Sequence, residues 1–454
     1  MEQANVCEAA IKSFKRNYHA LVNEETGMIP EEFISPVSDL PTLSSISSTS
    51  TEFDPDLLAQ TVSIKLNGGL GTSMGLQKAK SLLPVKNDLT FLDIIVNQIS
   101  YLREHTGAEV KFLLMNSFST SEGTLEHMEQ YDDLNLAQPE DVELMQNQIP
   151  KIDADTLTPA EHNVNPDLEW CPPGHGDLFA AIEGTGWLDR LLSQGIKYAF
   201  VSNADNLGAV LEPNILSHFA QSGNPFLMEV TRRTEADKKG GHLAVRNSDN
   251  QLLLREVAQC PEDDLENFQN IDTHQFFNTN SLWIRLDSLK KALEQHDGII
   301  PLPMIINSKT VDPRDKKSTS VYQLEVAMGA AIECFPGASA ICVPRSRFAP
   351  VKTTSDLFAL RSDAYETTVD GRLALITKRD GKPPIVNLSD EYKLVDSLEG
   401  LGCPSLKDAD RISISGHVRF AENVTIKGSV SFKNEDNKTK WIASGTYKDE
   451  DIVL

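Results

Sequence analysis

The chain lacks the features that mark secreted, membrane-embedded and metal-cluster proteins. Its six cysteines are scattered, and no two of them form a CxxC pair. No stretch reaches the ~18–20 consecutive apolar residues that a membrane helix needs. The first residues, MEQANVCEAAIKSFKRNY, contain no apolar signal core. This composition predicts a cytoplasmic protein with free thiols and no membrane association.

Positive charge is also scarce. The 454 residues include 42 Lys and Arg against 66 Asp and Glu, a formal net charge of -24. Nucleic acid is therefore excluded as a general partner, because binding it requires many cations to neutralise the backbone phosphates. A phosphorylated small molecule still fits where lysines lie beside glycines whose N–H groups face the anion.

What the chain does have is an alternation of short β-branched runs and helical patterns. The candidate strands are TVSIKLN (61–67), VKFLLMN (110–116), KYAFVSN (197–203), PFLMEVT (225–231), FFNTNSLWI (276–284) and ASAICVP (338–344). Candidate helices include FLDIIVNQISYLREH and one long stretch, DLFAAIEGTGWLDRLLSQG. This alternation predicts an α/β fold with a mostly parallel sheet between helices. Ligands of such sheets bind beyond the carboxyl ends of the strands.

The two ends of the chain differ from this centre. Residues 1 to about 23 predict an amphipathic helix. The Pro/Ser/Thr-rich stretch from Ile29 through SSISSTS to about Thr51 predicts a linker or a packed irregular arm. After about Asp410, Ile and Val recur at roughly six-residue spacing, which is typical of a hexapeptide β-helix. An ordinary pair of hairpins is the alternative.

These patterns predict three parts: an N-terminal arm (1–55), a central α/β domain (56–385) and a β-helix-like tail (386–454). A β-helix coil cannot bury its own end. We therefore expect the tail to dock on the central domain or on another subunit.

The strongest local feature is the glycine-rich segment LNGGLGTSMG, which begins at Leu66 and is followed by Lys80. It follows an apolar strand, so its N–H groups can face an anion, and its glycines allow a phosphate to approach the backbone closely. It is not a Walker loop, since no glycine directly precedes Lys80. It is not a dinucleotide fingerprint either, because the third glycine falls one place late, at Gly75.

A second polar segment, Ser202-Asn203-Ala204-Asp205-Asn206, ends the strand predicted at 197–203. A carboxylate at the carboxyl end of a strand, beside amides, suits a Mg²⁺ that keeps several waters and binds phosphate oxygens.

Together these segments resemble the eukaryotic-type UTP–glucose-1-phosphate uridylyltransferases, also called UDP-glucose pyrophosphorylases. The glycine-rich segment is close to the signature of that family, and PRSRFAPVKTTSDL (344–357) matches another family motif nearly letter for letter. PPGHGD (172–177) also falls in the family's order. The related N-acetylhexosamine pyrophosphorylases usually carry an arginine where Ser73 stands, which favours the glucose branch. The resemblance extends from about Val62 to the C-terminus.

The resemblance implies a Rossmann-like, GT-A-like nucleotidyltransferase with a mixed, mostly parallel sheet and a short C-terminal left-handed β-helix. It implies UTP-binding roles for Leu66, Asn67, Gly68, Gly69, Lys80, Gln146, Gly174, Asp205 and Lys352. It implies sugar-phosphate-binding roles for Gly69, His175, Asn203, Glu229, Gly241, Asn278, Thr279 and Asn280. Asp205 is the implied Mg²⁺ ligand, and Lys80 and Lys352 are the implied catalytic cations. Gln148 is the alternative to Gln146 as the residue that contacts the uracil.

The implied reaction is attack by glucose 1-phosphate on the α-phosphorus of UTP, giving UDP-glucose and pyrophosphate. The nucleophile is already an anion, so no general base is needed. A broader UDP-sugar pyrophosphorylase is the alternative. A non-catalytic sugar-nucleotide binding protein is disfavoured because Lys80, Asp205 and Lys352 are all present. An NAD-dependent oxidoreductase is disfavoured by the glycine spacing. The tail also makes a homo-oligomer possible.

Overall fold

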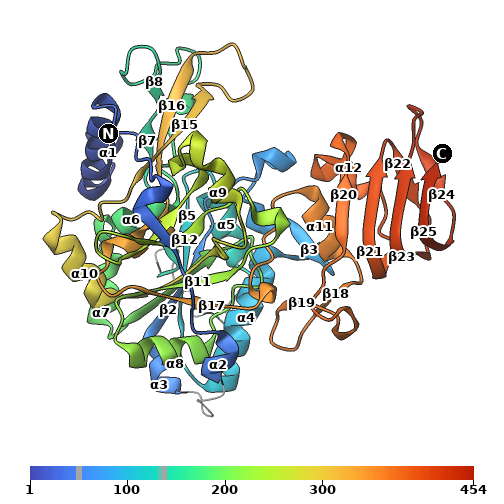
Figure 1. The fold of residues 1–454 in the computed structure, drawn as a ribbon, viewed down its shortest axis with the longest axis horizontal. Coiled ribbons are helices and arrows are strands. Elements are labelled where there is room, and N and C mark those ends of the chain that lie inside the picture. Colours follow the sequence, from blue (N-terminus) through green and yellow to red (C-terminus); the bar gives the residue numbers. More distant parts are fainter. Residues whose placement is uncertain (48–53, 132–133, 135–140) are drawn as a thin grey trace.

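A mixed β-sheet between helices forms the centre of the molecule, and a stack of parallel strands projects from one side (Figure 1). The computed structural model describes residues 1–47, 54–131, 134 and 141–454. Residues 48–51 of the predicted linker lie outside the described residues. No helix in these ranges is both long and apolar enough to cross a bilayer.

The central sheet runs in the order β1-β12-β14-β10-β2-β5-β6, and β11 pairs with both β14 and β17. Its strands are β1 (Ile34–Pro36), β2 (Thr61–Leu66), β5 (Lys111–Asn116), β6 (Glu143–Met145), β10 (Tyr198–Asn203), β11 (Phe226–Arg232), β12 (His242–Arg246), β13 (Leu252–Arg255), β14 (Phe276–Arg285) and β17 (Ser339–Cys342). The run β10-β2-β5-β6 is parallel, whereas β14 joins β10 antiparallel. The predicted mixed α/β architecture is confirmed, and all six predicted strands form.

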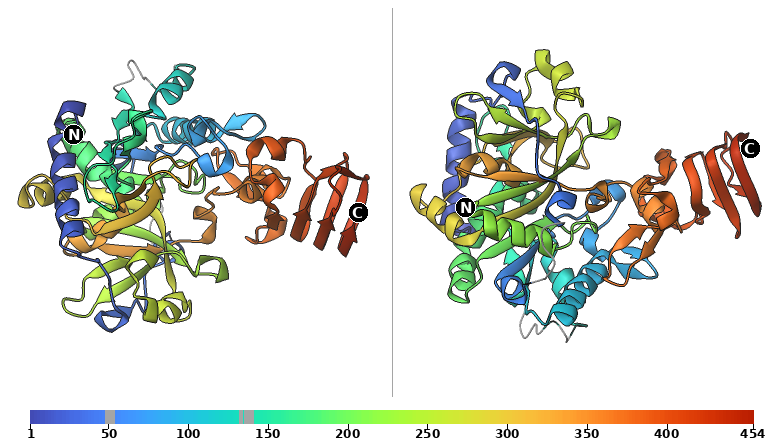
Figure 2. Two further views of the ribbon diagram at one scale, coloured as in Figure 1. Left: turned by 90° about the horizontal axis from the view of Figure 1, so that it is seen from above. Right: turned by 60° about the horizontal axis from the view of Figure 1, so that its bottom comes forward.

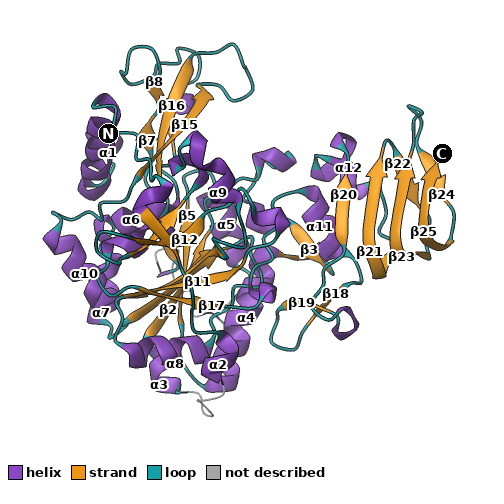
Figure 3. Cartoon of the chain, viewed as in Figure 1, coloured by secondary structure: helices purple, strands orange, loops and turns teal. Residues whose placement is uncertain are grey.

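The alternation of side chains along a strand explains why both faces of this sheet are covered. On β10, Val201 contributes to a core with α6 (Leu178–Gly184), α7 (Trp187–Ser193) and α10 (Leu286–Gln295), whereas Phe200 faces α8 (Pro213–Ser222). On β5, Phe112 packs under α4 (Phe91–Thr106). Figure 3 shows the helices on both sides of the strands.

The long helix expected over DLFAAIEGTGWLDRLLSQG is two helices, so that prediction is wrong. Helix α6 ends at Gly184 and α7 begins at Trp187. Gly186 between them has φ 77°, a left-handed conformation that ends a helix and that glycine adopts without steric cost.

The N-terminal segment is packed rather than free. Helix α1 (Glu8–Val22) lies against α6, and its Phe14 and Tyr18 contact a cluster around β7 (Ile149–Pro150), β8 (Ile152–Asp153) and β16 (Ser320–Val326). Strand β16 also pairs with β15 (Met304–Thr310). The turn η2 (Glu31–Phe33) and β1 follow, and β1 pairs with β12 of the central sheet. Of the two predictions for this stretch, the packed arm is the correct one.

The tail is a stack of parallel strands, which excludes the hairpin alternative because hairpin strands pair antiparallel. One face consists of β20 (Ile385–Leu388), β21 (Ser405–Ser415), β23 (Val424–Lys433) and β25 (Gly445–Val453), and another of β22 (Val418–Phe420) and β24 (Lys440–Ile442). Ile412 and Val430 are register partners and are buried.

The tail docks on the central domain, one of the two expected positions. Its apolar interior is continuous with the core beneath α4 and α11 (Thr354–Arg361). Both views of Figure 2 show the coils extending away from the sheet, with the two chain ends on opposite sides of the molecule.

Candidate active site

Two adjoining cavities lie at the carboxyl ends of the parallel strands. The first, about 320 Å³, is lined by the glycine-rich loop after β2 together with Gln146 and Asp205. The second, about 330 Å³, is lined by residues of β14, by Gly240, Gly241 and Glu256 at the base of the β12–β13 hairpin, and by the segment around Lys352. His175 and Asn203 line both cavities. We name them the nucleotide cavity and the sugar cavity after the ligands that the family resemblance implies for their lining residues.

The glycine-rich loop is held from behind by a buried amide network. Asn67 is 3% exposed, and its Nδ2 donates to Asn116 Oδ1 at 2.8 Å and to Thr124 Oγ1 at 3.0 Å. Asn116 Nδ2 in turn donates to Glu143 Oε1 at 2.7 Å. The Asn67 amide therefore fixes the start of the loop rather than reaching into the cavity, and the Lys80 N–H closes the loop on Gly69 O at 3.0 Å.

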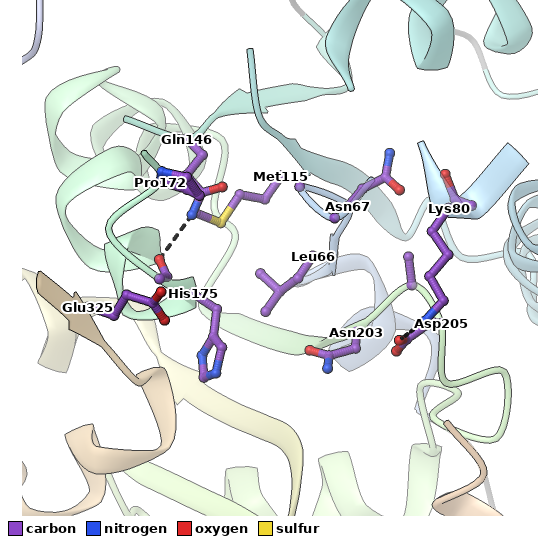
Figure 4. A pocket seen from close by; sticks show the side chains of 15 residues that line it. Leu66, Asn67, Lys80, Met115, Gln146, Pro172, His175, Asn203, Asp205 and Glu325 are labelled. Carbon is purple, nitrogen blue, oxygen red and sulfur yellow. Dashed lines mark hydrogen bonds and ion pairs between the residues drawn. The ribbon is translucent and has the colours of Figure 1, made fainter. Parts of the chain in front are cut away.

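Gln146, rather than Gln148, is the glutamine in the nucleotide cavity (Figure 4). Its Nε2 donates to Gly174 O at 2.9 Å. A Cβ added at Gly68 would lie 2.6 Å from Gln146 Oε1, so glycine at this position leaves room for the amide. The amide thus presents an acceptor at the cavity wall beside the glycine-rich loop.

The PPGHGD segment forms a turn whose conformation depends on glycine. Gly174 has φ 81°, and a Cβ there would lie 2.6 Å from Val326 O. His175 Nδ1 is 3.0 Å from the Met328 N–H, which can only donate, so Nδ1 accepts and Nε2 carries the proton. Burial and then the charge of Lys352 lower the pKa of His175 to about 4. His175 is therefore a neutral hydrogen-bond donor near pH 7.

Behind this turn, Asp177 is 4% exposed and anchors the residue next to Gln146. Its carboxylate accepts the Asn147 N–H at 2.7 Å and the Asn147 amide at 3.1 Å. Burial raises the pKa of Asp177 to about 6, although these hydrogen bonds oppose the rise. Asp177 therefore connects the turn that carries His175 to the segment that carries Gln146.

Lys80 and Asp205 form an ion pair at the far end of the nucleotide cavity (Figure 4). Lys80 Nζ lies 2.7 Å from Asp205 Oδ2 and also donates to Val351 O. Asp205 Oδ1 and Asn203 Oδ1 are buried and have no hydrogen-bond partner among the residues that the structure describes. Buried oxygens are rarely left unpaired, so these two indicate a position for a ligand.

Lys352 is exposed and lines the sugar cavity, although the sequence predicts it at UTP. Its N–H donates to Asp356 Oδ2 at 2.8 Å, which also accepts from Thr353 in the capping box of α11. The Val351 carbonyl, one residue earlier, accepts from Lys80. The two cationic residues predicted to be catalytic are thus connected through one main-chain segment.

A β-bulge carries the amides of the sugar cavity. The pairing of β11 with β14 shifts register between Glu229 and Val230, opposite Thr279 and Asn280. Asn280 has φ 56°, and its N–H donates to Asn278 Oδ1 at 2.9 Å. Bulges re-aim side chains near functional sites. Asn278, Thr279, Asn280 and Gly241, four of the residues predicted to bind the sugar phosphate, all line the sugar cavity.

Glu229 is predicted to bind the sugar phosphate, but it is not one of the described residues that line either cavity. It is fully buried, and its carboxylate accepts from Arg347 Nε at 2.7 Å, Arg347 Nη2 at 2.8 Å and Trp283 Nε1 at 2.9 Å. Lys65 is buried close to Glu229. Its burial and the charge of Arg347 lower the pKa of Lys65 to about 7. Glu229 therefore lies beneath the cavity floor, as the counter-ion of Arg347.

Sequence reasoning missed Glu256, which lines the sugar cavity after β13. Burial raises the pKa of its carboxyl group, while Lys352 and the Gly241 N–H oppose the rise. A Cβ added at Gly241 would lie 2.5 Å from Glu256 Oε1, so the carboxylate rests directly on that glycine. The sequence around Glu256 contains no motif that marks it as a site residue. Its position beside Gly241 follows from the register of the β12–β13 hairpin.

The unpaired oxygens of Asp205 and Asn203 are the candidate ligands for Mg²⁺. Among the described residues, no group of three or more His, Cys, Asp or Glu side chains could hold a metal ion by itself. Mg²⁺ commonly takes one or two protein oxygens and completes its shell with waters and substrate phosphates. One carboxylate and one amide oxygen beside a phosphate-binding loop fit this pattern.

Comparison with known proteins gives matches to one family over most of the chain. Residues 11–427 match the family model described as UTP–glucose-1-phosphate uridylyltransferase. The Saccharomyces cerevisiae enzyme of that name is 39% identical over 399 residues, covering 87% of this chain and 78% of the yeast protein. The Solanum tuberosum enzyme is 41% identical over 380 residues, covering 83% and 77%.

Solved structures of UDP-glucose pyrophosphorylases are similar to this chain over its whole length. The UDP-glucose pyrophosphorylase of Leishmania major, solved in open and closed forms, superposes with a TM-score of 0.94 at 46% identity, covering 100% of this chain and 98% of that one. A single-residue mutant of the same Leishmania enzyme, solved in complex with UDP-glucose, gives a TM-score of 0.93 at 47% identity, with the same coverage.

Proposed function

The chain belongs to the UTP–glucose-1-phosphate uridylyltransferase family, and we propose that the two adjoining cavities are where it performs this family's reaction. It transfers the uridylyl group of UTP to glucose 1-phosphate and forms UDP-glucose and pyrophosphate. The observation that carries the placement is that His175 and Asn203 line both cavities. A nucleotide in one cavity and a sugar phosphate in the other would meet at these two residues.

The nucleotide cavity suits UTP. The Gln146 amide offers both an acceptor and a donor to the edge of uracil, and the loop from Leu66 to Gly69 offers main-chain groups to the ribose and phosphates. Lys80 supplies a positive charge at the opposite end. The uracil therefore lies toward Gln146 and Gly174, and the phosphates toward Lys80 and Asp205.

The sugar cavity suits glucose 1-phosphate. His175 presents Nε2–H to the phosphate, and Asn278, Asn280 and Glu256 offer acceptors and donors to the hydroxyls. Polar groups on rigid strands give a pyranose a defined orientation. Lys352 lies in this cavity, so its ammonium group would lie near the bridge between the two substrates.

In the reaction, a phosphate oxygen of glucose 1-phosphate forms a bond to the α-phosphorus of UTP, and the bond from that phosphorus to the bridging oxygen breaks. Pyrophosphate leaves with the electron pair, so no proton needs to move. Lys80 and Lys352 neutralise the charge that develops, and the two cavities hold the substrates in line. Losing one such cation costs about 3–4 kcal/mol of transition-state stabilisation by analogy with an oxyanion donor.

We propose Mg²⁺ as the cofactor, held by Asp205 with Asn203 beside it. The support is the pair of buried, unpaired oxygens on these side chains. Bound Mg²⁺ would supply charge neutralisation at the phosphates. Lys80 now pairs with Asp205, so we expect the binding of metal and UTP to redirect the Lys80 ammonium group toward a phosphate.

We also propose a cytoplasmic location and a site for self-association. All six cysteines are free thiols, which suits a reducing compartment.

The site proposed for self-association is the last strand of the tail. Among the strands that the structure describes, β25 pairs only with β23 and leaves one edge open, and a second copy of the chain could pair there. Size-exclusion chromatography with light scattering tests this: a single species of 50.1 kDa would exclude the oligomer.

The test of the function is pyrophosphate release by the purified protein with Mg²⁺, UTP and glucose 1-phosphate. Galactose 1-phosphate, N-acetylglucosamine 1-phosphate and ATP serve as substitute substrates. We expect release with UTP and glucose 1-phosphate far above every other pair. Comparable release with several sugars would support the broader UDP-sugar enzyme, and no release with any pair would contradict the proposal.

A further inference from the structure

The β12–β13 hairpin places two sugar-cavity residues at the same end. His242 and Arg255 are the last register pair of the hairpin; Gly241 directly precedes β12, and Glu256 directly follows β13. Cross-strand partners point to one face and their neighbours to the other. Glu256 therefore faces the sugar cavity, while His242 and Arg255 face the opposite side and are fully buried.

On that opposite side, Arg255 is held by a residue of the N-terminal arm. Arg255 Nη1 donates to Glu31 Oε2 at 2.5 Å, and Nη2 donates to Asp264 Oδ2 at 3.2 Å. The other oxygen of Glu31 lies 2.8 Å from Nε2 of His274, which is fully buried and stacks on His242 with ring centroids 3.9 Å apart. Glu31 thus supplies the carboxylate that joins both buried side chains.

The main chain around Glu31 is attached at further points to the hairpin and to the segment that follows it. The Glu31 N–H donates to Asp264 Oδ2 at 2.7 Å, and the Ile29 N–H donates to Gln259 O at 2.7 Å in the turn that follows Glu256. Three residues after Glu31, β1 pairs antiparallel with β12, with Ile34 opposite Arg246. The arm therefore fastens both strands of the hairpin and the turn beyond it.

No step of the proposed reaction involves Glu31, Arg255 or His274. We propose that Glu31 is a positioning residue for the sugar: by holding Arg255 it fixes the last rung of the hairpin, and so sets Glu256 and Gly241 against the hexose. The inference rests on the proposed function, because it assigns the sugar cavity to the hexose. Glu31 does not touch the substrate. The N-terminal arm is thereby part of the structure that discriminates the sugar, while the nucleotide cavity is independent of it.

The experiment compares Glu31→Gln with Glu32→Gln, the same change at the exposed neighbour in the same turn. Calorimetry measures the affinity for UDP-glucose and for UDP, and steady-state kinetics measures KM for glucose 1-phosphate and for UTP. We expect Glu31→Gln to weaken UDP-glucose binding and raise KM for glucose 1-phosphate by roughly three- to tenfold, the net size of one ordinary hydrogen bond. UDP affinity and KM for UTP stay as in the wild type, and Glu32→Gln matches the wild type throughout.

Equal weakening of UDP and UDP-glucose, or no change in either, would overturn the inference. Thermal unfolding shows whether Glu31→Gln is folded. If it is not, Glu31→Asp serves in its place, because it keeps the charge but is one methylene too short to hold Arg255 and His274 together. The wild type separates the two proposals: if it neither releases pyrophosphate nor binds UDP-glucose more tightly than UDP, the proposed function fails. If it does both and the Glu31 variant keeps the same difference, only the role of Glu31 fails.

Discussion

Replacing Arg347 by methionine should destabilise the protein strongly, because it leaves the carboxylate of Glu229 buried without its counter-ion. The Arg347 side chain is 6% exposed and that of Glu229 is 0% exposed. The substitution removes the hydrogen bonds from Nε and Nη2 to Glu229 and the bond from Nη2 to Val210 O at 2.9 Å. Within the described part of the chain, Trp283 Nε1 alone would still donate to the carboxylate.

Breaking a buried ion pair from one side typically costs 3–5 kcal/mol, so we expect the free energy of unfolding to fall by about 4 kcal/mol. Urea unfolding followed by tryptophan fluorescence and circular dichroism measures the loss. Arg314→Met is the control, because the Arg314 side chain is 83% exposed, and exposed pairs contribute ~0–1 kcal/mol.

A double variant tests the cause. Adding Glu229→Gln to Arg347→Met removes the unpaired charge and should recover most of the lost stability, because a neutral amide is much less costly to bury. Turnover should stay low in both variants, since both lack the guanidinium that ties the segment before Lys352 to the Glu229 carboxylate and to Val210 O. If Arg347→Met loses no more than Arg314→Met, or if the double variant is no more stable than the single one, the reasoning is refuted.

Three further predictions concern the reaction and its pH dependence. Lys352→Ala should lower kcat by ~10²–10³ without unfolding the protein, whereas Lys382→Ala, at an exposed position, should leave it unchanged; a near-normal kcat would remove Lys352 from the mechanism. Asp205→Asn should lose the response of activity to Mg²⁺ in a titration, and an unchanged response would place the metal elsewhere. The pKa of His175 is lowered from 6.5 to about 4 by burial and by Lys352, so the unfolded chain takes up this proton first as pH falls, and stability is lost between pH 6.5 and 4. His175→Gln should lose less stability than the wild type between pH 7 and 5 in urea unfolding, and an equal loss would contradict the assignment.

The nucleotide cavity could be predicted largely from the sequence because its chemistry is local. The glycine-rich loop directly follows the buried strand β2, and Asp205 comes directly after β10. Parallel pairing of β10 with β2 then brings the two segments to one edge of the sheet. A strand pattern and the polar residues at its end are sufficient for such an assignment.

The sugar side depends on long-range pairing and was predicted less completely. Glu229 lies within an apolar strand, and only its partner Arg347, 118 residues away, shows that its charge is satisfied beneath the cavity. Glu256 is visible only through the hairpin register that sets it beside Gly241. The break between α6 and α7 depends on one glycine conformation, which helical periodicity does not report.

The C-terminal coils have a consequence for how far the chain can be shortened. Lys352 shares the Asp356 cap with the first turn of α11, and the Leu388 N–H of β20 donates to Ser355 Oγ in that turn at 3.2 Å. A chain ending before Ile385 would leave α11 without this strand and without much of the apolar cluster that continues into the coils. The smallest fragment that keeps Lys352 in place therefore includes the coils. A truncated chain that ends before Ile385 would keep both cavities but would not hold Lys352 in a fixed position.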